Sequence, residues 1–183
     1  MDKNTHIEVS AGKLQRNWGW LLTLGIVFLI LGTIGLSMAV GLTLVSVFFL
    51  GIILIIAGVA QIIDTFKSKH WQGALWHALV ALLYIAAGMV IIYDPVLAST
   101  ALTALIASFL IVIGVLRFVM ALQLRGSKGW GWLLFAGLMA IVLGGLILAQ
   151  WPWSGLWVIG LLIAIDLIIS GWTYIVLALA IRP

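Results

Sequence analysis

Six long apolar stretches, separated by short polar or turn-forming segments, fill the sequence from residue 18 onward. Each is about as long as the roughly 20 residues of helix that cross a hydrocarbon core of about 30 Å. The stretches are uninterrupted rather than alternating, which is typical of helices and not of barrel strands. The pattern therefore predicts an all-α membrane protein with six transmembrane helices. The predicted spans are approximately 18–40, 42–63, 74–93, 97–122, 130–149 and 154–181.

The pattern repeats along the chain with a spacing of 56 residues. Three series of residues keep this spacing, the last with a single-residue slip: Trp20, Trp76 and Trp132; Gly32, Gly88 and Gly144; Gly58, Gly114 and Gly171. Each unit contains two spans, so the sequence predicts three parallel helical-hairpin repeats, at about 18–66, 71–122 and 129–181. We expect them to close around a pseudo-threefold axis. Inverted repeats, common in secondary transporters, do not fit this pattern, although parallel repeats occur in some carriers.

Small residues lie seven apart in every predicted helix. The six pairs are Gly25 and Gly32, Gly51 and Gly58, Ala81 and Gly88, Ala107 and Gly114, Gly137 and Gly144, and Ala164 and Gly171. Seven residues are close to two helical turns, so each pair lines one face. Helices in lipid associate by close backbone approach over small residues. We interpret these stripes as packing seams, the alternative being a pore lined by glycine.

Short turns are expected to join the two helices of each hairpin on the outer side. They read Val40-Gly41-Leu42, Asp94-Pro95 and Gln150-Trp151-Pro152-Trp153. Proline in the second and third turns cannot continue a helix and forces the chain to reverse. Tryptophans near the start of each odd-numbered helix are expected to anchor it at the inner membrane interface.

Composition and charge distribution restrict the class of protein further. The chain of 183 residues is 65% hydrophobic and 8% charged, which leaves no room for a soluble catalytic domain. It has no cysteine, so disulfides and thiolate chemistry are excluded. All nine basic residues lie in the N-terminal segment, the second and fourth loops, the C-terminus or adjoining helix ends. This positive-inside pattern predicts cytoplasmic termini, with residues 1–17 as a cytoplasmic tail, and contact with lipid rather than nucleic acid.

Asp166 is the first candidate functional residue. Counted from Gly155, it lies about 16 Å along the sixth span, near the bilayer centre. An ionised carboxylate there costs roughly 2.5–3.5 kcal/mol, so the group must face the bundle interior, be protonated or have a partner. One interpretation is a proton-responsive switch or relay. The other is a neutral carboxyl that holds neighbouring helices in register by a hydrogen bond.

A second group of polar residues is predicted near the inner face. Arg117 corresponds by the 56-residue spacing to Gln61, and to Thr173 or Tyr174 in the third repeat. Along the helix axes, the depth of Asp64 differs from that of Arg117 by only about 4.5 Å. Asp64 is therefore a better candidate partner for Arg117 than Asp166 is. The sequence therefore predicts a polar ring of Arg117, Asp64, Gln61 and Tyr174. Arg117 alone is equally consistent with a side chain that extends to the headgroups.

The remaining titratable residues give no catalytic or metal pattern. Asp94 is expected to cap or shape an outer turn and to meet external acid first. His6, His70 and His77 lack the helical spacing of metal ligands and are interpreted as interfacial. The sequence has no phosphate loop, metal-binding helix pair or serine nucleophile elbow. We therefore expect no enzyme activity and no cofactor.

From Trp18 to Leu179 the chain resembles the HdeD-like family of bacterial acid-resistance membrane proteins. The first outer turn, Ala39-Val40-Gly41, departs from the proline that this family usually has there. The resemblance implies a role in acid-stress survival in the inner membrane and brings no catalytic residue set. Its most specific segments are Gly114-Val115-Leu116-Arg117-Phe118, Gly129-Trp130-Gly131-Trp132, the run from Trp151 to Gly160, Ile165-Asp166-Leu167 and Gly171-Trp172.

The sequence thus favours a non-enzymatic inner-membrane protein of the acid-stress response, with Asp166 as its proton-sensitive group. One alternative is a small channel or transporter for protons or a small solute, which requires a continuous polar path through nearly apolar outer helix halves. Another is a membrane assembly or scaffold factor. The sequence leaves open a homo-oligomer and the identity of any protein partner.

Overall fold

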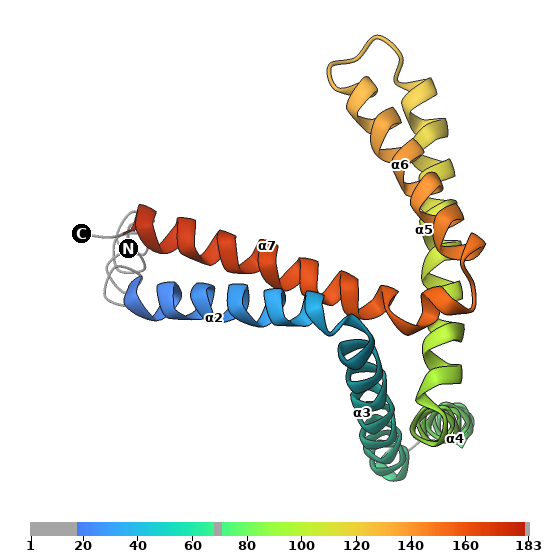
Figure 1. Cartoon of the computed structure of the whole chain (residues 1–183). Helices are drawn as coiled ribbons and strands as arrows, with labels where there is room; N and C mark the ends of the chain where they lie inside the picture. Colours follow the sequence, from blue (N-terminus) through green and yellow to red (C-terminus); the bar gives the residue numbers. More distant parts are fainter. Residues whose placement is uncertain (1–17, 68–70, 182–183) are drawn as a thin grey trace, which may run out of the picture. The chain divides into compact units, whose positions relative to one another are not determined.

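The computed structural model describes residues 18–67 and 71–181, and every regular element in these ranges is helical (Figure 1). The predicted tail, residues 1–17, lies outside the described residues. Six helices are long and apolar enough to cross a membrane, which confirms the predicted all-α class. The elements are α2 (Trp18–Ser37), α3 (Ala39–Lys67), α4 (Trp71–Tyr93), α5 (Pro95–Gln123), α6 (Trp130–Ala149), the 3₁₀ helix η1 (Trp153–Leu156) and α7 (Val158–Ala180).

Two predicted boundaries need correction. The first outer turn is at Met38, whose N–H still bonds to the Ile34 carbonyl, and Val40-Gly41-Leu42 already belongs to α3. Without a proline in this turn, both helices continue until one residue separates them. The sixth span also begins later than predicted, because residues 153–156 form η1 before α7 starts at Val158.

The helices form three closely packed antiparallel pairs: α2 with α7, α3 with α4, and α5 with α6. Figure 1 shows α2 beside α7 and α5 beside α6. Two small-residue contacts hold each pair, and a step of seven residues along one helix is matched by a step of seven back along its partner. The six contacts are Gly25–Gly171 and Gly32–Ala164, Gly58–Ala81 and Gly51–Gly88, and Gly114–Gly137 and Gly144–Ala107.

Every one of these contacts includes at least one glycine. A Cβ atom built on Gly32 would lie 2.9 Å from the Ala164 carbonyl oxygen and 2.6 Å from Ile168 Cγ1. The same arrangement recurs at Gly58, where the carbonyl of Ala81 and the side chain of Ile85 occupy the space. The facing small residue and the isoleucine four positions after it thus fill the space that a side chain would need. The stripes predicted from the sequence are the surfaces along which the pairs meet.

The partners in these pairs differ from those of the predicted hairpins. Every small-residue contact joins a helix of one predicted hairpin to a helix of another, including α2 to α7, the first and last spans. The described chain divides into two compact units, residues 18–39 with 160–181, and residues 40–159. The first unit is built on the α2–α7 pair, and the second contains the α3–α4 and α5–α6 pairs.

The segment after α6 contacts both α5 and the end of α6 within the second unit. The indole N–H of Trp151 donates to the Thr100 carbonyl at 3.2 Å, and the Ser154 hydroxyl donates to the Ile147 carbonyl at 2.8 Å. Gly155 packs directly on Thr100, so that a Cβ there would lie 2.5 Å from the Thr100 Cα. The Trp-Pro-Trp-Ser-Gly sequence therefore holds η1 against the first turns of α5.

We predict that Gly144→Ala destabilises the α5–α6 pair by about 1–3 kcal/mol, the usual cost of overpacking. The added Cβ would lie 2.7 Å from the Ala107 carbonyl oxygen, which cannot move without separating the helices. The change is measured as the free energy of unfolding of the purified protein in bicelles.

Gly145→Ala is the matched control, since no atom lies within 4 Å of its added Cβ. We expect this change to be neutral or to stabilise the helix by up to about 1 kcal/mol, because alanine favours helix over glycine. An equal decrease in the free energy of unfolding for Gly144→Ala and Gly145→Ala would contradict the seam as the source of stability.

Candidate functional site

Asp166 lies in the central part of α7, on the side turned away from α2. It is eight residues into the helix, about 12 Å from its start rather than the 16 Å expected from the earlier boundary. Ala164, two residues before it, is fully buried against α2, whereas Asp166 is exposed. Two residues correspond to about 200° around a helix. The carboxyl group therefore points away from the helix that packs along α7.

No titratable side chain of α2 is available to Asp166. The helix from Trp18 to Ser37 contains no acidic, basic, histidine or tyrosine residue. Tyr174, the other titratable side chain of α7, is half-buried two turns away and contacts Phe28 edge to face, with ring centroids 5.7 Å apart. Among the described residues of α2 and α7, Asp166 is thus the one carboxyl side chain, near the middle of α7, with Leu162 and Ser170 one turn before and after it on the same face.

The predicted polar ring is distributed over three helix pairs. Gln61, Arg117 and Tyr174 each lie three residues after a seam glycine, at equivalent places in α3, α5 and α7. Arg117 is exposed, and its Cβ lies 3.2 Å from the position that a Cβ of Gly137 would take. Asp64 is in α3, but its side chain lies outside the described residues. A single ring of these residues stays a prediction.

Gln61 has a partner that the sequence analysis missed. Its side-chain Nε2 lies 3.1 Å from Nδ1 of His77, across the α3–α4 pair. The sequence alone indicates only an interfacial position for His77. The signal that could have found the contact is the seam register, because Gln61 follows Gly58 by three residues and His77 precedes Ala81 by four.

Asp94 caps α5 at the turn between α4 and α5. Its Oδ1 accepts a hydrogen bond from the backbone N–H of Leu97 at 2.9 Å, and Pro95 occupies the first helical position. Aspartate is a favoured N-cap, and proline fits the first turn because its missing N–H would lack a helical partner anyway. Asp94 and Pro95 therefore end α4 and start α5, and Asp94 is the one residue between the two helices.

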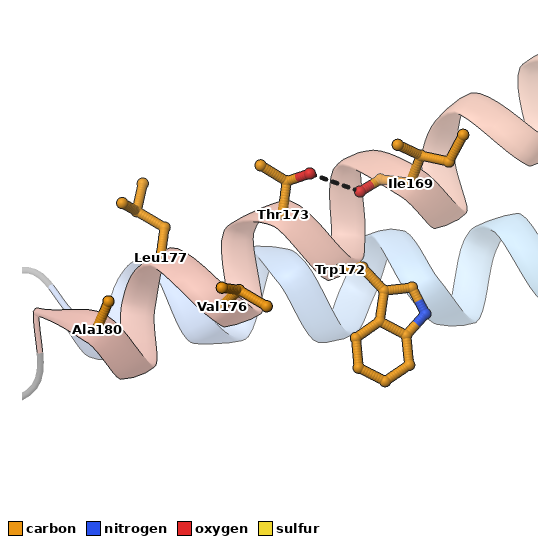
Figure 2. Close-up of a pocket in the computed structure, with 6 residues that line it drawn as sticks. All are labelled: Ile169, Trp172, Thr173, Val176, Leu177 and Ala180. Atoms are coloured by element: carbon orange, nitrogen blue, oxygen red, sulfur yellow. Dashed lines mark hydrogen bonds between the residues drawn. The ribbon is translucent and has the colours of Figure 1, made fainter. Parts of the chain in front are cut away.

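A surface groove of about 560 Å³ lies along α7 and is apolar (Figure 2). Its one hydroxyl group, on Thr173, donates to the Ile169 carbonyl at 2.8 Å and is thereby satisfied within the helix. No cluster of three or more His, Asp or Glu residues that could hold a metal occurs in the part of the chain that the structure describes. The six lining residues, all from α7, are Ile169, Trp172, Thr173, Val176, Leu177 and Ala180.

Six long apolar helices joined along glycine seams define a multi-span α-helical membrane protein. The chain belongs to the family described as "Short repeat of unknown function (DUF308)", whose model matches residues 23–93 and again residues 79–149. The two matches are offset by 56 residues, the spacing found in the sequence. No solved structure matches the chain.

Curated relatives carry the name Protein HdeD. Those from Escherichia coli K12, Escherichia coli O157:H7 and Shigella flexneri are each 33% identical to this chain over 124 residues. The match covers 66% of this chain and 65% of each relative, slightly less than two thirds of their length. The resemblance to the HdeD-like family is thereby confirmed.

We predict that Asp94→Ala lowers the free energy of unfolding by about 0.5–2 kcal/mol, because the Leu97 N–H loses its acceptor. Asp94→Asn keeps a side-chain oxygen at the same place and should retain most of the stability. Unfolding of both variants in bicelles, beside the wild type, measures the difference. Equal stability of the wild type and Asp94→Ala would show that the cap contributes nothing.

Proposed function

We propose that this protein is a non-enzymatic inner-membrane protein of the acid-stress response, in which Asp166 is a proton-sensitive group. Its relatedness to the HdeD proteins and its six apolar helices support the cellular role. The observation that carries the mechanism is the position of Asp166, exposed at mid-depth on α7 and turned away from α2.

The physical basis is the cost of a charge in hydrocarbon. An ionised carboxylate near the bilayer centre costs roughly 2.5–3.5 kcal/mol, and a protonated carboxyl group avoids most of this cost. A neutral carboxyl group can also donate a hydrogen bond to whatever covers this face of α7. Protonation of Asp166 would therefore favour a more closely packed arrangement of α7, and acid would act through helix packing.

The proposal includes an orientation in the membrane. The basic residues favour cytoplasmic termini, which would place the Lys67 end of α3 and the Arg125–Lys128 loop on the cytoplasmic side. Asp94 and the Trp151–Trp153 turn would then face the outside. The offset of 56 residues between the two family matches supports parallel repeats in one chain. Trp20, Trp76 and Trp132, between 66% and 76% exposed, fit interfacial anchors at equivalent places.

Acid survival tests the proposed role. Cells that lack the endogenous protein and express Asp166→Asn should survive an acid challenge no better than cells without the gene, because the amide cannot change its charge. The measurement is the number of viable cells after the challenge, at equal protein level in the membrane. Asp94→Asn is the matched control and should survive like the wild type. Full survival with Asp166→Asn would refute the role of this carboxyl group.

Proton flux separates acid-dependent packing from a proton channel. We expect liposomes that contain the purified protein to leak protons no faster than empty liposomes after an imposed pH step, because the groove on α7 is lined by no charged residue. A fluorescent pH indicator inside the vesicles measures the rate. Flux above that of empty vesicles, lost in Asp166→Asn, would establish a proton pathway instead.

A further inference from the structure

The α3–α4 pair contains a hydrogen bond between side chains that the proposed function does not use. Gln61 Nε2 lies 3.1 Å from His77 Nδ1, near the inner end of the two helices. An amide NH₂ group can only donate, so the ring nitrogen that faces it must accept. With the Gln61 amide in this orientation, the contact corresponds to a neutral imidazole whose proton is on Nε2.

The other two helix pairs have no such contact at the equivalent place. The residues 56 positions from His77 are Leu21 in α2 and Leu133 in α6. The residues equivalent to Gln61 are Arg117 in α5 and, with the single-residue slip, Tyr174 in α7. The small-residue seam is common to all three pairs, whereas a histidine at this height is confined to α3–α4. The pairs with leucine at this place can therefore serve as controls for the α3–α4 pair within the same protein.

We infer that His77 and Gln61 form an acid-responsive contact that changes the packing at the inner end of α3 and α4. Imidazole ordinarily changes its charge between about pH 5 and pH 8. A proton added from water to Nδ1 turns the acceptor into a donor that faces the amide NH₂. The Gln61 amide must then turn over to present its oxygen, or the two side chains separate.

The charge that protonation adds also acts on the helices. An imidazolium ion at this depth is drawn toward the headgroups and water at the inner interface. His77 is already exposed on α4, whereas Gln61 is half-buried against the seam, so we expect the histidine side to move. The predicted result is a wider separation of α3 and α4 beyond the Gly58–Ala81 contact, while the seam itself stays closed.

Among the described side chains, few titratable groups lie near His77 on α3 and α4. On α3, Asp64 and Lys67 lie about one and two turns beyond Gln61, and their side chains lie outside the described residues. On α4 itself, the nearest titratable side chain toward the outer end is Tyr84, two turns from His77. α5 follows α4 at Asp94, which lies at the end of α4 opposite to His77, and the one titratable side chain within α5 is Arg117. The inference does not rest on the role proposed for Asp166.

Distances between spin labels in liposomes test the inference, and the absence of native cysteine permits the labelling. One sample carries labelled cysteines at Ile63 and Leu79, which are 52% and 49% exposed on α3 and α4. The matched sample carries them at Val119 and Phe135, the equivalent positions on α5 and α6, which are 44% and 51% exposed. Electron–electron resonance gives each separation at pH 8 and pH 5.

We expect the Ile63–Leu79 separation to increase by about 1–2 Å at pH 5, the usual size of helix shifts at switching interfaces. The Val119–Phe135 separation should not change. In His77→Leu the α3–α4 separation should be the same at both pH values. Leucine occupies both equivalent positions, which makes this a conservative replacement within the repeat pattern.

Nitrogen NMR of the imidazole in the wild-type protein provides a readout that does not depend on the variant. We expect an unprotonated Nδ1 and a protonated Nε2 at pH 8, and two protonated nitrogens at pH 5. A ring that stays neutral at pH 5, a protonated ring without any change in helix separation, or an equal change in both helix pairs would each overturn the inference. These results are independent of acid survival with Asp166→Asn, so failure of one proposal is distinguishable from failure of the other.

Discussion

Close approach of backbones at small-residue contacts is the interaction on which the rest of this structure depends. In lipid, burying one leucine against another gains little, so helices must associate through dispersion contacts over a large, smooth area. At all six seam contacts a carbonyl oxygen or a side chain of the facing helix occupies the place of a missing Cβ, and no contact joins two alanines. Each pair of helices is therefore fixed in register at two levels about two turns apart. A shift along the axis would bring a larger side chain against the partner backbone at both levels.

This register determines which polar side chains meet. Gln61 reaches His77 because both lie about one turn beyond the same Gly58–Ala81 contact. Asp166 is directed away from α2 because it lies two residues, and so about 200°, from the seam residue Ala164. Tyr174 lies three residues after the seam glycine Gly171, which turns it toward α2, and its ring is half-buried against Phe28. The polar chemistry of the membrane region thus follows from the placement of glycine and alanine, residues that have no chemistry of their own.

The amino-acid pattern predicts the six spans and the residues of the seams, since apolar length and seven-residue spacing are local properties. It does not predict which helices pair. A spacing of 56 residues is satisfied whether a helix packs on its hairpin partner or on a helix of another hairpin, and only contacts such as Gly25 with Gly171 distinguish the two. The contact between His77 and Gln61 was missed for this reason, because it requires the pairing to be known. The Asp94-Pro95 turn can be predicted because its residues act locally. The turn at Met38 has no proline, and the turn predicted from the sequence lies two to four residues after it.

A chain built from near-identical units can have a distinct chemical property only where the units differ. The seams are nearly the same in the three pairs, so they explain stability and cannot explain why acid would act on one part of the protein. Asp166, His77 and Arg117 occupy positions where the other units have apolar or differently polar residues. Asp166 and His77 can gain a proton, and they lie on different helix pairs, one near mid-depth and one near an end. A protein that responds to acid through both would change the face of α7 and the Gln61–His77 end of α3–α4 separately, while the glycine contacts keep each pair intact.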